Sequence, residues 1–290
     1  MRYLTAIILL LLTLNSQAQL PINDYKIYDT KLKKEVQLAD IISQMDNADV
    51  LFFGEEHNDS VGHVLELELF KLLYAKYGNK AIASFEMFHT DIQSVMDEYL
   101  LGIISEKNFL KESRPWNNYK DYKPIVEFAK TNNLKVVAAN AAARYSNAVT
   151  VSGLDILKKL PESSFKYIPK LPIDTATGRY YDKFIETLGG HSMGGMKIYQ
   201  TQNFWDATMA WSIQKYFKLN PKSKIIHYVG RFHSDEKLGT FSQLKKLNPK
   251  IKALNISTFS AADFKNPDWQ KYNQLGDFVI VTNPEIKRTF

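Results

Sequence analysis

Two copies of the short motif Gly-x-x-His contain residues that could carry out chemistry. Gly54 and His57 form the first copy, and Gly230 and His233 form the second. Glu55 lies inside the first copy. Imidazole and carboxylate side chains together bind metal ions or transfer protons. The motifs therefore predict a ligand-binding or catalytic site.

Each motif follows a short apolar run of the kind that forms a buried β-strand. The four strongest runs cover residues 50–53, 81–85, 134–138 and 225–229. In an open parallel sheet the carboxyl ends of the strands lie along one edge, and ligands bind there. We therefore expect one crevice to contain the polar residues that follow these runs: Glu55, His57, Glu86, Asn140 and His233.

Helical patterns separate the apolar runs. This alternation predicts an α/β fold with a mostly parallel central sheet flanked by helices. The expected helices cover residues 60–77, 90–101, 120–132, 142–158, 176–188, 195–218 and 238–247, and two weaker strand candidates cover 253–256 and 278–282. No linker rich in Pro, Gly or Ser divides the chain, so we expect residues 19–290 to form a single domain.

Several residues on the expected helices could support the crevice. The helix after Asn140 would direct its N-terminus at the crevice, which suits a carboxylate or a propionate, and Arg144 would add positive charge. Tyr145 is the phenol nearest to this point in the sequence. In a later helix, Gln202 and Asp206 interrupt an apolar stripe, which predicts a structural hydrogen-bond network or support for the crevice histidines.

The N-terminal residues are typical of a secretory signal peptide. An apolar run at 6–14 is followed by Ser16 and Ala18, and this predicts cleavage after residue 18. The chain has no cysteine, which excludes disulfides, thiolate metal sites and a lipid-anchored cysteine. We therefore expect a periplasmic or extracellular protein that is not a Cys-anchored lipoprotein. The net charge of +6 is spread along the chain, which argues against a nucleic-acid partner.

These motifs resemble those of the ChaN family of haem-binding uptake proteins, which is related to the Tiki and TraB proteins and more distantly to erythromycin esterase. The resemblance runs from about residue 45 to 282 and rests on residues 54–58, His63, 85–88, 139–141, 199–210 and 230–233. It implies a ChaN-like α/β fold and an exported, iron-related protein. It further implies a homodimer that holds two cofacial haems, each with a tyrosine ligand and an assisting histidine. Tyr145 is the candidate ligand, with Tyr180 or Tyr181 in reserve.

Two functions remain open at this stage. The first is haem or iron binding for uptake, with an outer-membrane partner and with Tyr145, His57, His233, Arg144 and Asn140 as binding residues. The second is a hydrolase in which Glu55 or Glu86 activates water, assisted by His57. A divalent metal in such a site would be held by His57, His233, Glu55 and Glu86.

Overall fold

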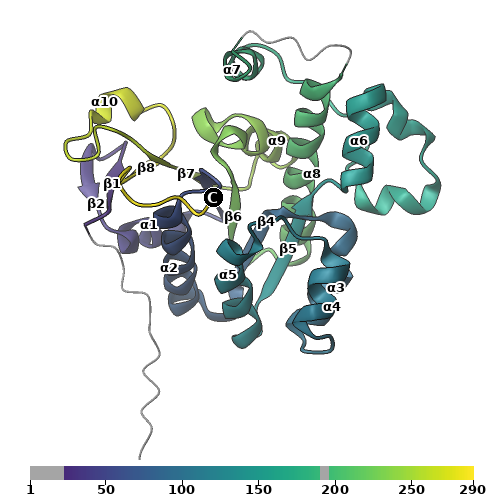
Figure 1. The fold of residues 1–290 in the computed structure, drawn as a ribbon, viewed down its shortest axis with the longest axis horizontal. Helices are drawn as coiled ribbons and strands as arrows, with labels where there is room; N and C mark the ends of the chain where they lie inside the picture. Colours follow the sequence, from purple (N-terminus) through teal and green to yellow (C-terminus); the bar gives the residue numbers. More distant parts are fainter. Residues whose placement is uncertain (1–22, 190–195) are drawn as a thin grey trace, which may run out of the picture.

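The computed structural model describes residues 23–189 and 196–290, so the expected signal peptide lies outside the described residues. An eight-stranded sheet in the order β2-β1-β8-β7-β3-β6-β4-β5 forms its centre (Figure 1). The strands are β1 (Tyr25–Asp29), β2 (Lys34–Val36), β3 (Val50–Glu55), β4 (Ala81–His89), β5 (Lys135–Asn140), β6 (Lys224–Gly230), β7 (Ala253–Ser260) and β8 (Phe278–Thr282). The strands from β8 to β5 pair in parallel, and β1 pairs antiparallel with both β2 and β8. The predicted α/β fold with a mostly parallel sheet is confirmed.

Helices cover both faces of this sheet (Figure 1). The α-helices are α1 (Leu38–Gln44), α2 (Ser60–Tyr77), α3 (Gln93–Leu100), α4 (Glu106–Ser113), α5 (Tyr119–Thr131), α6 (Ala143–Ser152), α7 (Arg179–Thr187), α8 (Ile198–Leu219), α9 (Gly239–Leu247) and α10 (Trp269–Tyr272). Helices α1, α2, α3 and α5 pack on one face, and α8 and α9 pack on the other. Both faces of the central strands are therefore buried.

The sequence of β3 shows how one strand serves both layers. Val50 and Phe52 belong to the core under α8 and α9, whereas Leu51 and Phe53 belong to the core under α1, α2 and α5. Successive side chains of a strand point to opposite faces, so a strand buried on both faces reads as a continuous apolar run. This is why the run at residues 50–53 locates a central strand.

Some elements differ from the prediction. The pair β1 and β2 and the helices α1 and α4 were not predicted, and β4 continues to His89 instead of ending near Phe85. The helix predicted over 142–158 ends at Ser152, because Gly153 takes a φ of 82° that breaks the helix. Residues 154–159 then form a 3₁₀ turn.

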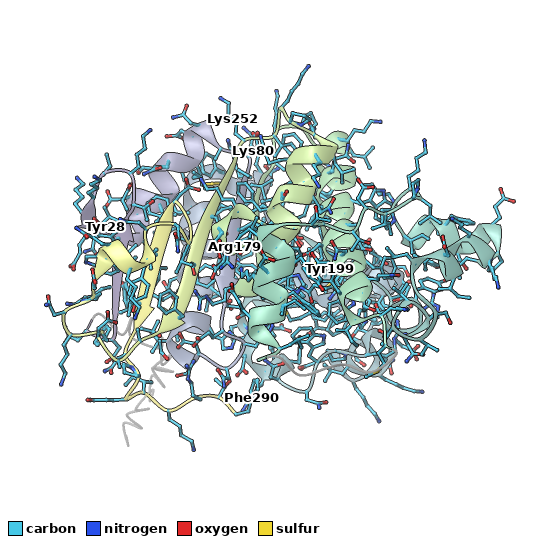
Figure 2. All side chains as sticks on the ribbon, turned by 90° about the horizontal axis from the view of Figure 1, so that it is seen from above. Tyr28, Lys80, Arg179, Tyr199, Lys252 and Phe290 are labelled. Atoms are coloured by element: carbon cyan, nitrogen blue, oxygen red, sulfur yellow. The ribbon has the colours of Figure 1, made fainter. Side chains whose placement is uncertain are left out.

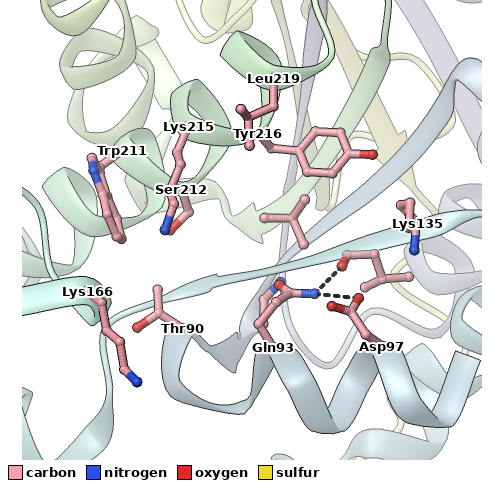
Figure 3. Close-up of a pocket in the computed structure, with 13 residues that line it drawn as sticks. Thr90, Gln93, Asp97, Lys135, Lys166, Trp211, Ser212, Lys215, Tyr216 and Leu219 are labelled. Atoms are coloured by element: carbon pink, nitrogen blue, oxygen red, sulfur yellow. Dashed lines mark hydrogen bonds between the residues drawn. The ribbon is translucent and has the colours of Figure 1, made fainter. Parts of the chain in front are cut away.

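A side chain protects the exposed edge of β5. The Gln93 amide donates to the Val136 carbonyl at 2.8 Å and accepts from the Ala138 N–H at 2.8 Å, as a neighbouring strand would. Gln93 also donates to Asp97 at 3.2 Å, within a cavity of about 250 Å³ between α3 and α8 (Figure 3). The Gln93 amide in this cavity is therefore hydrogen-bonded within the protein at both its nitrogen and its oxygen.

Aromatic stacking covers the opposite side of the sheet. Tyr28 of β1 stacks on Trp269 of α10 with ring centroids 4.7 Å apart, and Figure 2 labels Tyr28 beside this short yellow helix. The C-terminal residues run back to the β3–α2 connection, where Arg288 donates to Glu56 at 2.7 Å.

Among the described residues, none of the helices has both the length and the apolarity needed to cross a membrane.

Asp59 joins the start of α2 to the end of β8. Its carboxylate accepts from the Val61 N–H at 3.1 Å and from the Thr282 hydroxyl at 2.6 Å, in a buried position. Asp59→Ala removes this N-cap and is expected to lower the free energy of unfolding by about 1–2 kcal/mol in urea titrations. The exposed cap Ser105, whose contact with the Asn108 N–H is 3.4 Å long, provides the control. Equal losses in Asp59→Ala and Ser105→Ala would contradict this.

Candidate functional site

A cavity of about 510 Å³ lies at the carboxyl ends of β3, β4, β5 and β6. It is lined by His57 after β3, Glu86 and His89 of β4, Asn140 at the end of β5, and His233 after β6. The structure therefore brings together four of the residues that the strand-end argument placed in one crevice. Glu86 lies inside β4 and not after it, because β4 extends to His89 with a register shift against β5 beyond Phe85.

Helices α6 and α8 and the segment before α5 complete the walls of the cavity. The lining residues of α6 are Ala143, Ser146, Asn147 and Thr150, whose spacing places them on one helix face. Trp116 contributes an aromatic wall beside His57, with ring centroids 5.0 Å apart. Trp205 of α8 contributes another and donates its indole N–H to Ser146 at 2.9 Å. The cavity thus combines flat aromatic surfaces with ionisable groups.

Glu86 is held as a carboxylate in this cavity. It is 5% exposed, and one oxygen accepts the Gly230 N–H at 2.7 Å while the other lies 3.4 Å from His233 Nε2. Burial alone would raise the pKa of Glu86. The neighbouring His233 and His57 and the Gly230 N–H outweigh burial and lower that pKa to about 2. Glu86 therefore supplies a fixed negative charge at neutral pH.

His233 is held between two carboxylates. Its Nδ1 donates to Asp206 Oδ1 at 2.7 Å, on the side opposite Glu86. Burial would lower the pKa of His233, but Glu86 and Asp206 raise it to about 10. Asp206 also accepts from the hydroxyl groups of Tyr180 and Thr240. His233 is therefore an imidazolium with a buried and fully bonded support.

His57 also lines the cavity, but a carboxylate holds its ring at one nitrogen only. Its Nδ1 lies 2.8 Å from Glu55 Oε1, and the same oxygen accepts the Tyr122 hydroxyl at 2.7 Å. Burial would lower the pKa of His57, but the hydrogen bond to Glu55 and the charge of Glu86 raise it. Because Glu55 takes up Nδ1, Nε2 is the atom available to a ligand.

The absence of a side chain at Gly230 lets His57 occupy this position. A Cβ atom at Gly230 would lie 2.7 Å from His57 Nε2, which is too close for the ring to stay in place. Gly230→Ala is therefore expected to lower the free energy of unfolding by about 1–3 kcal/mol. In the His57→Ala background the same change should have little effect, because the clashing ring is gone. Urea unfolding of wild type, Gly230→Ala, His57→Ala and the double variant measures this coupling. If the losses of unfolding free energy in the two single variants add up in the double variant, the clash is not the cause.

Three residues predicted for the site do not line the cavity. Glu55 is buried behind His57. Tyr145 packs among apolar residues of α6, α8 and the following turns, and its hydroxyl accepts from Arg144 at 3.1 Å. Arg144 forms an ion pair with Asp91. Tyr145 lies on the face of α6 opposite the cavity, because it shares a stripe with Val149 and not with Ser146.

The reserve tyrosines are also engaged elsewhere. The Tyr180 hydroxyl donates to Asp206, and burial raises its pKa well above the usual value. Tyr181 is exposed and its ring contacts Tyr199 with centroids 5.0 Å apart. Trp116, Trp205 and the polar stripe of α6 were not predicted as cavity residues. The spacing of the stripe was visible in the sequence and could have revealed it.

The two charged neighbours Glu86 and His233 predict a pH dependence of stability. The pKa of His233 rises from 6.5 to about 10, so its contribution is complete below its unfolded pKa and disappears as the pH rises towards 10. The pKa of Glu86 falls from 4.5 to about 2, so its contribution disappears only as the pH falls below 4.5. Between pH about 6.5 and 10, the free energy of unfolding should fall more steeply in wild type than in His233→Asn. Urea titrations with parallel slopes would contradict this assignment.

Comparison with known proteins identifies the family. Residues 41–244, well over half of the chain, match the family described as "Haem-binding uptake, Tiki superfamily, ChaN". The chain belongs to the ChaN family. This confirms the family that the motifs resemble. Among curated proteins, no match was found.

Solved structures resemble this chain to different degrees. The structure described as "Cofacial heme binding to ChaN of Campylobacter jejuni" matches with a TM-score of 0.67 and 17% identity, over 90% of this chain and 97% of that one. A mutant of the erythromycin esterase EreC in its open conformation matches with a TM-score of 0.48 and 13% identity, over 91% and 84%. The RRSP effector domain of Vibrio vulnificus CMCP6 gives a TM-score of 0.42 and 16% identity, over 86% and 38%. The last two likenesses are too distant to bear on function.

Proposed function

We propose that this chain binds haem in the cavity beside His57 and serves the uptake of haem or iron. Its membership of the ChaN family supports the ligand class. The observation that carries the assignment to this cavity is the arrangement of His57, which lines the cavity while its Nδ1 is bonded to Glu55. Histidines that ligate metal ions, including haem iron, commonly have one ring nitrogen on the metal and the other hydrogen-bonded to a carboxylate or a backbone carbonyl.

The residues of the cavity fit a haem. The cavity volume of about 510 Å³ lies within the usual range for cofactor sites. Trp116 and Trp205 offer flat apolar surfaces, and the small side chain of Ala143 lines the cavity at the start of α6. A bound haem would supply an iron centre and a large apolar ring, and His57 would hold the iron. His233 and Glu86 would provide a fixed pair of opposite charges beside it.

We further propose that the protein is exported and works as a homodimer. The signal-like residues 1–18 support export. The cofacial haems described for ChaN of Campylobacter jejuni support a site in which two copies of this chain each hold one haem. On this account the partner in uptake is a protein of the outer membrane that delivers haem. The chain itself is located in the periplasm or outside the cell.

Titration of the purified chain with hemin tests the proposal. We expect saturable binding with one haem per chain and a Soret band shifted from that of free hemin. Sedimentation of the haem-loaded protein should give twice the mass of the haem-free chain if two copies meet around the haems. A Soret band identical to that of free hemin at all ratios would contradict haem binding, and a monomer with bound haem would contradict the dimer alone.

A hydrolase is the second candidate, and a specific observation favours it. Glu55 orients His57 as the carboxylate orients the histidine in a catalytic dyad, and the His233 imidazolium lies across the same cavity. His57 Nε2 could take a proton from water while His233 stabilises the developing negative charge. Ester hydrolysis that is lost in both His57→Ala and Glu86→Gln would support this function. Equal turnover in the variants and wild type would reject it.

A further inference from the structure

A buried group of imidazole and carboxylate side chains lies behind His57, outside the cavity. Glu55 is the last residue of β3, and His63 and Glu66 lie one helical turn apart on α2. One potential ligand atom from each of the three residues lies within 4.8 Å of the others. Glu55 is 2% exposed, His63 7% and Glu66 0%. The first turns of α2 thus carry an imidazole and a carboxylate up to the end of β3.

The hydrogen bonds of this group leave buried oxygen atoms unsatisfied. Among the described residues, Glu55 Oε2 and Glu66 Oε1 accept no hydrogen bond. Buried carboxylate oxygens without a partner are rare, because removing them from water is costly. The hydrogen bond at His63 Nδ1 is to Glu66 Oε2 at 3.1 Å, and Glu66 Oε1 is left without a partner.

The other nitrogen of His63 fixes the orientation of its ring. His63 Nε2 lies 3.1 Å from the His57 carbonyl oxygen. A carbonyl only accepts, so Nε2 carries the proton and donates it. Nδ1 is then directed at Glu55 Oε2, 3.3 Å away, and at Glu66. Metal-ligating histidines have this pattern, with one nitrogen held by a backbone carbonyl and the other on the metal.

We propose that Glu55, His63 and Glu66 bind one divalent transition-metal cation. One imidazole nitrogen and two carboxylates are ligands that suit Zn²⁺, Mn²⁺ or Fe²⁺. A dication balances the two carboxylates in this enclosed position. The Tyr122 hydroxyl binds Glu55 Oε1 at 2.7 Å and leaves Oε2 to the cation. This site is separate from the haem cavity, since Glu55 reaches His57 only through Oε1.

A cation at this site would act on the cavity through Glu55. It would fix the position of Glu55, whose Oε1 accepts from His57 Nδ1 at 2.8 Å. The cation would therefore stabilise the β3–α2 junction and orient His57 without contacting a ligand in the cavity. The proposal does not depend on haem, and haem-free protein is used to test it.

The test is metal binding by the purified, haem-free chain. After treatment with a chelator and dialysis against Zn²⁺ or Mn²⁺, elemental analysis should find one metal ion per chain. The melting temperature should rise on addition of the same metal. Glu66→Gln and His63→Gln should each lose the bound ion and the metal-dependent rise. Glu68→Gln removes a carboxylate from the same helix, where Glu68 pairs with Lys71, and should retain both.

The variants separate this site from two alternatives. In the first alternative, Glu55 and Glu66 share a proton and no metal binds. Wild type then takes up no stoichiometric metal, and the melting temperatures of wild type and Glu66→Gln are equal with and without added metal. If the ion sits in the haem cavity, His233→Gln loses the ion while Glu66→Gln and His63→Gln keep it. Either result overturns the proposal. Retention of the ion in His233→Gln, with its loss in Glu66→Gln and His63→Gln, supports it.

Discussion

Hemin binding should weaken by more than about 100-fold when His57 is replaced by alanine, and the shifted Soret band should disappear. The outer partners of a ligating histidine alone are worth about 10–100-fold in affinity, so loss of the ligand itself has a larger effect. Of His57 and His233, only His57 has a ring nitrogen without a carboxylate partner, because His233 is held between Glu86 and Asp206. Spectroscopic titration with hemin measures the change.

Two further variants serve as controls for this result. Glu55→Gln keeps His57 but weakens its orienting hydrogen bond, so an intermediate loss of about 10–100-fold is expected. Tyr145→Phe should bind hemin like wild type, because the Tyr145 hydroxyl contacts Arg144 and not the cavity. Loss of binding in Tyr145→Phe together with normal binding in His57→Ala would show that the phenolate suggested by family resemblance is the ligand.

Asp206→Ala is expected to lower the free energy of unfolding by about 3–5 kcal/mol. Asp206 is fully buried and accepts from His233 at 2.7 Å and from Thr240 at 2.8 Å, in addition to Tyr180. Its removal leaves the imidazolium of His233 and two hydroxyl groups without their partner in a buried position. Breaking a buried pair by removing one member has an effect of this size. Urea unfolding near neutral pH measures it.

Asp155→Ala is the matched control for this substitution. Asp155 forms an exposed ion pair with Lys158 at 2.6 Å, and its loss should barely change the free energy of unfolding, because solvent screens exposed pairs. The losses in Asp206→Ala and His233→Ala should not be additive in the double variant, because the two residues share a buried hydrogen bond. Equal losses in Asp206→Ala and Asp155→Ala would mean that the buried network does not support His233.

The sequence predicts well the features that depend on burial and strand topology. The continuous apolar runs before Gly54 and Gly230 identify strands covered on both faces, and β3 and β6 are adjacent in the sheet. Adjacent parallel strands end at the same edge, so His57 and His233 meet in one cavity. Glu86 reaches the same cavity because its strand pairs with β6.

Other features depend on helix phase and long-range pairing, which the sequence pattern does not determine. Proximity in sequence to Asn140 made Tyr145 a candidate ligand, but the rotation of α6 turns it towards Phe204 and Leu157. Arg144 meets Asp91, a partner 53 residues away. His57 lies outside α2, so it does not share a helical face with His63. His63 instead contacts Glu55, because the end of β3 lies next to the start of α2.

A crystal structure of the hemin-loaded protein tests the central claim most directly. The account predicts the haem in the cavity at the carboxyl ends of β3, β4, β5 and β6, with His57 Nε2 bound to the iron and Trp116 or Trp205 against the ring. Iron bound by Tyr145, or a haem that contacts none of His57, Glu86 and His233, would contradict it.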